Sequence, residues 1–538
     1  MLNKRLDSIF LRDAALLSLA ALVSVLPALF FQLVPGYMDA EYYYAGAVNL
    51  FQGHGYFENY VWNTLNLPVS LPAASHVYWM PLPSILADLG MRLFNSRSYL
   101  DARYVTLVMS LFIPVVCYGF AYRISQQRRI GRIAGGFAVL SGVYLVYTNL
   151  VEAFTPYMLF GGLILVLAWL AFRTSSDQPW KLNIQFFCMG LLSGLMHLTR
   201  ADGILWIGFA AFLLVFLIWQ HKQWKPFLLP LILLVVGYFI IMSPWYFRNI
   251  QLYGWIFPPG NQYTLFLTGY NDNFLYPASQ ITMQRWLESG WQTILMDRVQ
   301  AVGANLLTAW MIQFEIVLLP FFVIWIRAHW KENYIRWLLL CYVLQLILMS
   351  IIFPYAGMRG GFFHSGSAFQ VIFWVGSAVG LDAAIKKLMD KRPYLDRRIP
   401  GMLYGGVIMI LAIITGMLYR QKVFGKENDL QNWQRGYVAY VQLNRALLAN
   451  GIDADQGVMV NNPPGFYLAS GRNAVVVPNA PIKGVVNLAR KFDIQYVILD
   501  THIVPALTDV YENHMSTDDV TYLFSSGEFN IYQIRGQE

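Results

Sequence analysis

Long runs of apolar residues alternate with short polar or basic stretches from residue 14 to residue 418 of the chain. A run of about 20 apolar residues can cross the hydrocarbon core of a bilayer as one α-helix. The pattern therefore predicts about eleven transmembrane helices. We place them near residues 14–33, 102–122, 133–150, 157–172, 183–198, 203–219, 226–243, 304–326, 337–353, 367–385 and 400–418.

The pattern after residue 420 is different. Short β-branched runs alternate there with helix-like stretches near residues 432–449 and 484–492, which predicts a small α/β domain. We therefore expect an α-helical polytopic membrane protein with a transmembrane domain over residues 1–419 and a soluble α/β domain over residues 420–538. Two further segments, residues 34–100 and 244–303, are loops long enough to build a site.

Composition agrees with a membrane protein. The residues AVILMFWYC make up 57% of the 538 positions and only 13% are charged, against about a quarter in soluble domains. These values exclude a soluble globule and a disordered chain. Nucleic acid is not expected as a partner, because the basic residues lie in short loops and form no basic domain.

The basic residues also predict an orientation. With Lys4 and Arg5 on the cytoplasmic side, more than half of the Lys and Arg residues fall in short segments of that side. The positive-inside rule then predicts a cytoplasmic N-terminus and, with eleven spans, an extracytoplasmic tail and extracytoplasmic long loops. The first apolar run lacks a convincing cleavage site, so we interpret it as an uncleaved helix. Short basic loops favour a plasma membrane, in particular a bacterial inner membrane.

Two carboxylates, Asp39 and Glu41, open the first long loop. Residues two apart on a helix do not share a face, so we expect them to have different tasks, one as a base and the other as a positioning group. The loop is rich in Tyr and Trp, which suit sugar rings but also gather at membrane interfaces. His76, later in the loop, is either structural or a substrate ligand.

Further ionisable residues lie at the extracytoplasmic ends of apolar runs. Such groups are costly at membrane depth, so they mark either a substrate path or internal ion pairs; Arg200 with Asp202 is one such pair, and Arg103 with Glu152 another. Several arginines on the side that carries Asp39 indicate a pocket for a phosphate group. The residues predicted to bind donor phosphate or substrate are Arg103, Glu152, Arg200, Arg248, Arg359, His364 and His76.

Glu315 lies well inside the eighth apolar run. It either pairs with an intramembrane arginine or marks a helix that begins later in the chain than residue 304. The sequence contains no P-loop, no His-Glu-x-x-His motif and no nucleophile elbow. Energy coupling by nucleotide hydrolysis is therefore not expected, and we assign no metal ligands.

Several short motifs, each present once, follow one another in a characteristic order along residues 10–385. They are Asp39-Ala-Glu41-Tyr-Tyr, Tyr78-Trp-Met-Pro-Leu-Pro83, Ala102-Arg103, the segment from Gly190 to Gly203 that contains Thr199-Arg200-Ala-Asp202, and Pro244-Trp-Tyr-Phe-Arg-Asn249 with Tyr253-Gly254 after it. In order and topology this set resembles the membrane-embedded type C (GT-C) glycosyltransferases. The resemblance is to the branch of the protein O-mannosyltransferases and the lipid A aminoarabinose transferase.

The resemblance implies roles for individual residues. The acidic residue at the head of the first external loop is the catalytic base in these families, which falls on Asp39. Their motif has adjacent acidic residues, whereas Ala40 separates Asp39 from Glu41 here, so Glu41 corresponds less directly. Arg103 matches an arginine that meets donor phosphate, and Glu152 matches a second external acidic residue. The segment 359–364 takes the place of a loop that approaches the lipid phosphate.

The chemistry of the residues leads to the same function. A sugar on a polyprenyl phosphate has a good leaving group, so one carboxylate base and nearby arginines suffice for transfer to an extracytoplasmic protein, lipid or glycan. A single base implies direct displacement with inversion. No cofactor is required and a divalent metal is optional in this scheme. The competing class is a transporter or sensor of lipid-linked or soluble sugars, although the internal repeats typical of transporters are missing.

Overall fold

A computed structural model describes residues 8–175, 178–425, 429 and 432–536. Lys4 and Arg5, which entered the predicted orientation, lie outside the described residues. The chain divides into two compact units. The helical unit comprises Met1–Phe31, Arg103–Phe247 and Val299–Asp429, and the α/β unit comprises Gln32–Ala102, Arg248–Arg298 and Leu430–Glu538.

Nine helices in the described residues are long and apolar enough to cross a membrane. They are Ser8–Phe31 (α1), Tyr104–Ser125 (α5), Phe154–Ala171 (α7), Pro179–Thr199 (α8), Ala201–His221 (η2 and α9), Lys225–Tyr253 (η3 and α10), Asn333–Ile352 (α14 and η8), Pro354–Lys391 (α15 to α17) and Ile399–Val423 (α18). These nine match nine of the eleven predicted spans. The polytopic helical fold expected from the apolar runs is confirmed.

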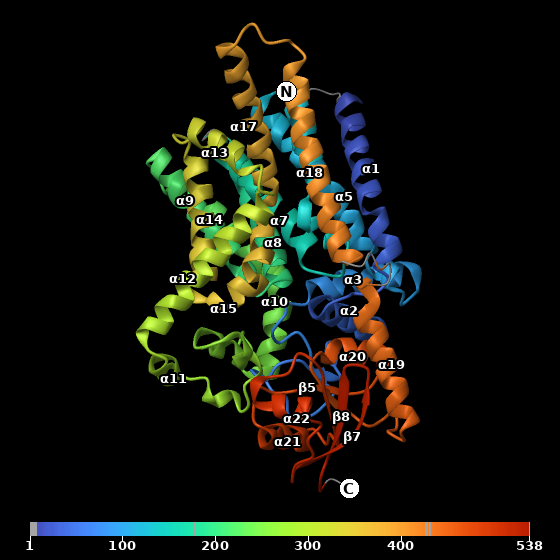
Figure 1. Ribbon diagram of the computed structural model, residues 1–538. Coiled ribbons are helices and arrows are strands. Elements are labelled where there is room, and N and C mark those ends of the chain that lie inside the picture. Colours follow the sequence, from blue (N-terminus) through green and yellow to red (C-terminus); the bar gives the residue numbers. More distant parts are fainter. Residues whose placement is uncertain (1–7, 176–177, 426–428, 430–431, 537–538) are drawn as a thin grey trace. The chain divides into compact units, whose positions relative to one another are not determined.

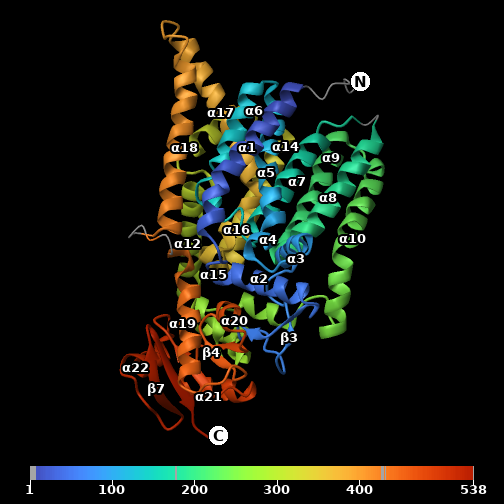
Figure 2. The ribbon, with the colours of Figure 1, turned by 90° about the vertical axis from the view of Figure 1, so that its right-hand side faces the viewer.

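The helical unit is built around α17 (Gln370–Lys391). This helix packs against α5, α6, α7 and α13 and is almost entirely buried along its first turns (Figure 1). Helices α7 and α9 both pack against α8, and α10 approaches α8 as well (Figure 2). Gly190 of α8 lets the backbones approach, because a Cβ there would lie 2.1 Å from the carbonyl oxygen of Leu234 in α10.

Two predicted spans differ from the structure. Near 133–150 the chain forms only the short α6 (Arg128–Val139) and the 3-10 turn η1 (Gly142–Val146). Near 304–326, α12 (Trp291–Thr308) passes into a π-helical turn, and α13 (Leu319–Ala328) begins later. The break occurs because Glu315 and Ile316 have φ angles of +47° and +64°, which a right-handed helix cannot contain. The second interpretation of Glu315, a later helix start, is the one observed.

The α/β unit contains a six-stranded sheet with the order β2-β5-β4-β6-β8-β7. Its strands are β2 (Tyr60–Val61), β4 (Val458–Val460), β5 (Ala474–Val476), β6 (Tyr496–Leu499), β7 (Val520–Ser526) and β8 (Phe529–Ile534). The first four strands in this order pair in parallel. Strand β8 then pairs antiparallel with β6 on one side and with β7 on the other. Strands β4, β5 and β6 are buried and wholly apolar, as is typical of parallel strands covered on both faces.

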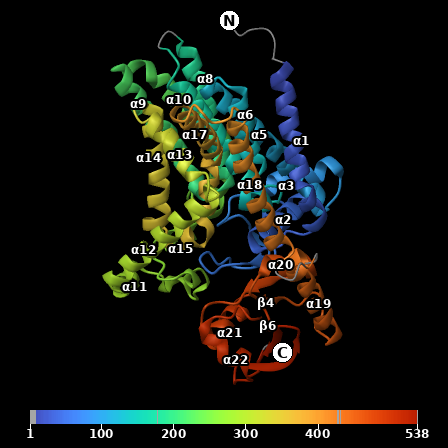
Figure 3. The ribbon, with the colours of Figure 1, turned by 45° about the horizontal axis from the view of Figure 1, so that its top comes forward.

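Helices cover this sheet. They are α19 (Arg435–Ala449), α20 (Pro463–Ser470), α21 (Ile482–Lys491) and α22 (Thr508–Glu512) (Figure 3). The predicted α/β character of the tail is confirmed. Strand β2, however, comes from the first long loop and pairs with β5 of the tail, so this loop and the tail belong to one folded unit.

The rest of the α/β unit comes from the two long loops. Its elements are α2 (Met38–Phe51), β1 (Phe57–Glu58), β3 (Ala73–Ala74), α3 (Leu82–Phe94), α4 (Tyr99–Ala102) and α11 (Met283–Glu288). Helix α2 packs against α3 on one side and against α20 of the tail on another. The helix that carries Asp39 and Glu41 is therefore held between a loop helix and a tail helix.

Candidate active site

Asp39 and Glu41 both lie in the first turn of α2. The N-terminus of a helix favours negative charge, because its first N–H groups point outward without partners in the helix. Successive residues of a helix are about 100° apart, so two residues two positions apart point to nearly opposite sides. Glu41 is accordingly buried at 5% exposure, whereas Asp39 is partly exposed. The two carboxylates have the different surroundings that different tasks require.

The carboxylate of Glu41 is bound by the tail. Asn462 donates a hydrogen bond from Nδ2 to Oε2 of Glu41 over 2.7 Å. Burial, assisted by the negative charge of Asp39 and opposed by the Asn462 bond, raises the pKa of Glu41 to about 7. The position and the protonation of Glu41 therefore depend on a hydrogen bond from a residue that lies far along the chain.

His76 lies in a buried hydrogen-bond network behind α2. Its backbone N–H donates to the hydroxyl of Tyr42 over 2.6 Å, and its ring nitrogens contact the hydroxyls of Ser75 and Ser84 at 2.8 and 2.9 Å. Ser84 donates its own proton to the carbonyl of Tyr43, so Nε2 of His76 carries a hydrogen and Nδ1 accepts from Ser75. Burial lowers the pKa of His76 to about 3. These contacts favour the structural interpretation of His76.

Arg248 supports the same network. Its Nη2 donates to the carbonyl of Ser75 over 2.7 Å, and its guanidinium lies over the ring of Tyr56 at 5.6 Å. The guanidinium is thus used to hold the two long loops together. Its predicted role in binding donor phosphate stays a prediction.

Glu58 is an ionisable residue near α2 that was not predicted from the sequence. It is buried at 5% exposure, is hydrogen-bonded to Tyr42 and interacts electrostatically with Arg248. Burial raises the pKa of Glu58 to about 8, while Tyr42 and Arg248 oppose the shift. The only signal in the sequence is an acidic residue among aromatic ones, which is common on protein surfaces and does not predict burial.

The stability of the protein should depend on the protonation of Glu58. In the unfolded chain this carboxyl loses its proton near the ordinary glutamate pKa of 4.5, but in the folded protein it keeps the proton to about pH 8. Between these values the unfolded chain binds fewer protons, so stability is full at the acidic end and falls as the pH rises through the window. We expect the melting temperature to drop less between about pH 5 and pH 8 in Glu58→Gln than in wild type, measured by thermal unfolding in detergent. Parallel melting curves for the two proteins would contradict this, and the exposed Glu512→Gln is the matched control.

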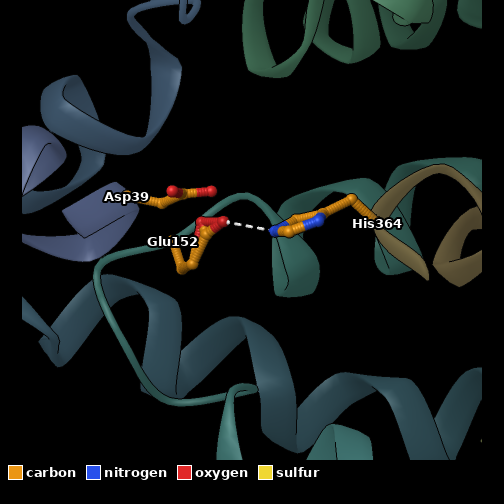
Figure 4. A group of neighbouring side chains, drawn as sticks. All are labelled: Asp39, Glu152 and His364. Atoms are coloured by element: carbon orange, nitrogen blue, oxygen red, sulfur yellow. Dashed lines mark hydrogen bonds and ion pairs between the residues drawn. The ribbon is translucent and has the colours of Figure 1, made fainter. Parts of the chain in front are cut away.

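Glu152 and His364 form the central pair of the helical unit (Figure 4). Oε1 of Glu152 lies 3.0 Å from Nε2 of His364, and Oε2 accepts the backbone N–H of Ala153 over 2.6 Å. The other ring nitrogen, Nδ1, lies 2.9 Å from the carbonyl oxygen of Gly360. The ring also stacks on Phe154, with centroids 4.1 Å apart. The structure thus brings together two residues predicted separately from the sequence.

The hydrogen bonds of His364 restrict what the pair can hold. A carbonyl oxygen only accepts, so Nδ1 carries a hydrogen and Nε2 of the neutral ring presents a lone pair to a carboxylate. Two acceptors facing each other need a shared proton or a cation between them. A histidine that donates from one nitrogen to a backbone carbonyl while the other faces a carboxylate is the usual arrangement of a metal ligand. The nitrogen and oxygen donors therefore fit a divalent cation.

The predicted arginines differ in how they are used. Arg103 is fully buried and donates to Oδ1 of Asn149 over 3.1 Å. Arg200 is paired with Asp202 at 2.9 Å, as the internal-pair interpretation expected. Arg359 lies at a kink before His364, where its own φ and ψ of −92° and 17° are not helical, and its side chain is exposed. Of the four predicted arginines, Arg359 is the one with an exposed side chain.

Comparisons with protein-family models and with curated proteins find no match to the chain. Solved structures do match. An oligosaccharyltransferase from Archaeoglobus fulgidus, in complex with zinc and sulfate, is 13% identical with a TM-score of 0.55, covering 90% of this chain and 67% of its own. The oligosaccharyltransferase AglB from Archaeoglobus fulgidus, in complex with an inhibitory peptide and a dolichol-phosphate, is 12% identical with a TM-score of 0.57, covering 91% of this chain and 69% of its own.

A second neighbour matches along its whole length. ArnT from Cupriavidus metallidurans, bound to undecaprenyl phosphate, is 11% identical with a TM-score of 0.52, covering 99% of both chains. The chain has the fold of GT-C glycosyltransferases. The resemblance seen in the short motifs is thereby confirmed at the level of the fold, and this fold includes the tail, because the match to ArnT extends over nearly all residues.

Proposed function

We propose that the protein is an integral-membrane glycosyltransferase that moves a sugar from a polyprenyl-phosphate donor to an extracytoplasmic acceptor. The observation that carries the proposal is Asp39, a partly exposed carboxylate in the first turn of a helix, in a fold shared with transferases. The solved neighbours bind dolichol-phosphate and undecaprenyl phosphate, which supports a lipid phosphate as the donor. We place the protein in a bacterial inner membrane with a cytoplasmic N-terminus and an extracytoplasmic tail.

The reaction that we propose is a single displacement. Asp39 takes the proton from an acceptor hydroxyl or amine as that group attacks the anomeric carbon. The bond from this carbon to the phosphate oxygen breaks on the opposite face, so the configuration inverts. The polyprenyl phosphate leaves with the electron pair, and the exposed guanidinium of Arg359 stabilises its growing charge. A divalent cation held by Glu152 and His364 would supply further positive charge.

The test is consumption of donor by the purified full-length protein. We would incubate it with a panel of polyprenyl-phosphate sugars and a membrane extract as acceptor, and detect free polyprenyl phosphate by mass spectrometry. We expect one donor to be consumed and the rest to stay intact. Binding of a donor without consumption, together with its appearance on the other side of a proteoliposome membrane, would instead establish a transporter.

A further inference from the structure

The tail contacts the Asp39 helix near both of its ends. Nε1 of Trp433 donates to the carbonyl of Val34, in the turn before α2, over 2.9 Å. Asn462 binds Glu41 in the first turn, and the hydroxyl of Tyr467 contacts Oδ1 of Asn49 near the last turn at 3.4 Å. All these residues lie in the α/β unit. The tail therefore follows α2 along its length.

The amide of Asn462 has a fixed orientation. Asn462 is the N-cap of α20, and its Oδ1 accepts the backbone N–H of Gly465. Asparagine is a preferred N-cap, and prolines at the next two positions have the φ angle that a helix start needs. With Oδ1 occupied by the cap, Nδ2 is left to point at Glu41. The capped start of this short helix thus directs Nδ2 of Asn462 toward Glu41, and the hydroxyl of Tyr440 also lies within hydrogen-bonding reach of Asn462.

The hydrogen bond lies where α20 closely approaches the first turn of α2. A Cβ at position 465 would lie 2.7 Å from Oε2 of Glu41 and 2.6 Å from Nδ2 of Asn462, so a larger residue there would displace one of these two side chains. Gly36, with φ of +84°, is required, because a Cβ there would lie 2.4 Å from the ring of Trp433. Tyr440 of α19 also faces Glu41. The tail therefore packs closely against α2 through specific side-chain contacts.

We propose that Asn462 is a positioning residue that holds Glu41, and through it sets the rotation of α2 and the direction of Asp39. Glu41 would then act through its hydrogen bond and not through its charge. The tail would be a part of the catalytic apparatus instead of a separate acceptor module. This inference rests on the proposed role of Asp39, since orienting α2 affects turnover only if Asp39 is the base.

The first test removes the hydrogen bond while keeping the helix cap. In Asn462→Ser the hydroxyl still caps α20 but is too short to reach Glu41. We expect kcat for donor consumption to fall about 10- to 100-fold, the size of effect that follows a small misplacement of a reacting group, with KM for the donor unchanged. Hydrogen exchange of the backbone amides of residues 38–51 should become faster. The control is Asn461→Ser, because Asn461 is equally half-buried but bonds to Asp500 and the carbonyl of His502.

The second test separates positioning from a charge role for Glu41. Glu41→Gln can still accept from Asn462, so we expect kcat near the wild-type value, whereas Glu41→Ala should resemble Asn462→Ser. Asn462→Asp places two acceptors face to face and should lower kcat. Combining it with Glu41→Gln restores a donor and an acceptor and should recover activity. Loss of activity in Glu41→Gln equal to that of Asp39→Asn would overturn the proposal.

Exchange and turnover together distinguish the two levels of inference. If wild type consumes no donor, the proposed function fails, and faster exchange in Asn462→Ser would still show that the tail holds α2. If wild type is active but Asn462→Ser changes neither exchange nor kcat, the positioning role is wrong and the proposed function stands.

Discussion

Replacing Asp39 by Asn should lower the rate of donor consumption by about 10³-fold or more, while the protein still binds the polyprenyl phosphate. The amide has nearly the shape of the carboxylate but cannot take a proton from the acceptor, and general base catalysis contributes about 10²- to 10⁴-fold. Asp39 is partly exposed in the first turn of α2, so the change should not disturb the buried contacts of Glu41 on the other side of the helix. The measurement is release of free polyprenyl phosphate under single-turnover conditions.

The control is Asp518→Asn, an exposed carboxylate in the same unit, which should behave as wild type. Binding of undecaprenyl phosphate by each protein, followed by native mass spectrometry, separates loss of chemistry from loss of donor affinity. If Asp39→Asn kept more than a tenth of the wild-type rate, another group would have to accept the proton, and the assignment of Asp39 as the base would fall.

The architecture of the helical unit could be predicted because a membrane span has a strong and local signal. Nine predicted spans are single helices or helix pairs in the structure. The two that are not, near 133–150 and 304–326, are interrupted by backbone conformations at Gly142, Glu315 and Ile316. Hydropathy averages over a window of residues and does not report a local change of φ, so the break at Gly142 has no signature in the apolar pattern, whereas Glu315 marked the second break as a charged residue inside an apolar run.

The residues of the site could be predicted one by one, but their partners could not. Glu152 and His364 were both identified from the sequence, yet they are 212 positions apart and their pairing depends on the packing of the helices. The pair Arg200 and Asp202 is different, because residues so close in sequence meet in a local turn. Local contacts follow from spacing, and distant ones require the fold.

The contribution of the tail could not be predicted at all. Its bond to Glu41 joins residues 421 positions apart, and Asn462-Pro-Pro-Gly465 has the sequence of an ordinary turn. Strand β2 is only two residues long and joins the sheet through its backbone, so alternation of side chains cannot reveal it. Glu58 likewise meets its partners Tyr42 and Arg248 only when the two long loops fold together.

Replacing Glu152 by Gln should lower turnover by about 10²-fold without unfolding the helical unit. Nδ1 of His364 donates to the carbonyl of Gly360, so Nε2 of the neutral ring can accept a hydrogen bond from the new amide. The variant therefore keeps the side-chain pair and loses only the negative charge. Removal of one electrostatic group from an active site typically costs about 10² to 10³ in rate. Glu332→Gln, which changes a surface carboxylate paired with Arg173 in the same unit, should be close to wild type.

Removal of metal should show whether the carboxylate of Glu152 binds a divalent cation or pairs with a protonated His364. We expect wild-type turnover to fall after treatment with EDTA and to recover on titration with Mn²⁺ or Zn²⁺, because a carboxylate oxygen and a histidine nitrogen oriented by a backbone carbonyl suit these cations. In Glu152→Gln the midpoint of the metal titration should rise at least about tenfold, since one anionic ligand is lost. Turnover that ignores EDTA would instead mean that the pair holds a proton between Oε1 and Nε2. The same substitution would then act by removing the counter-ion of an imidazolium, and added metal would restore nothing.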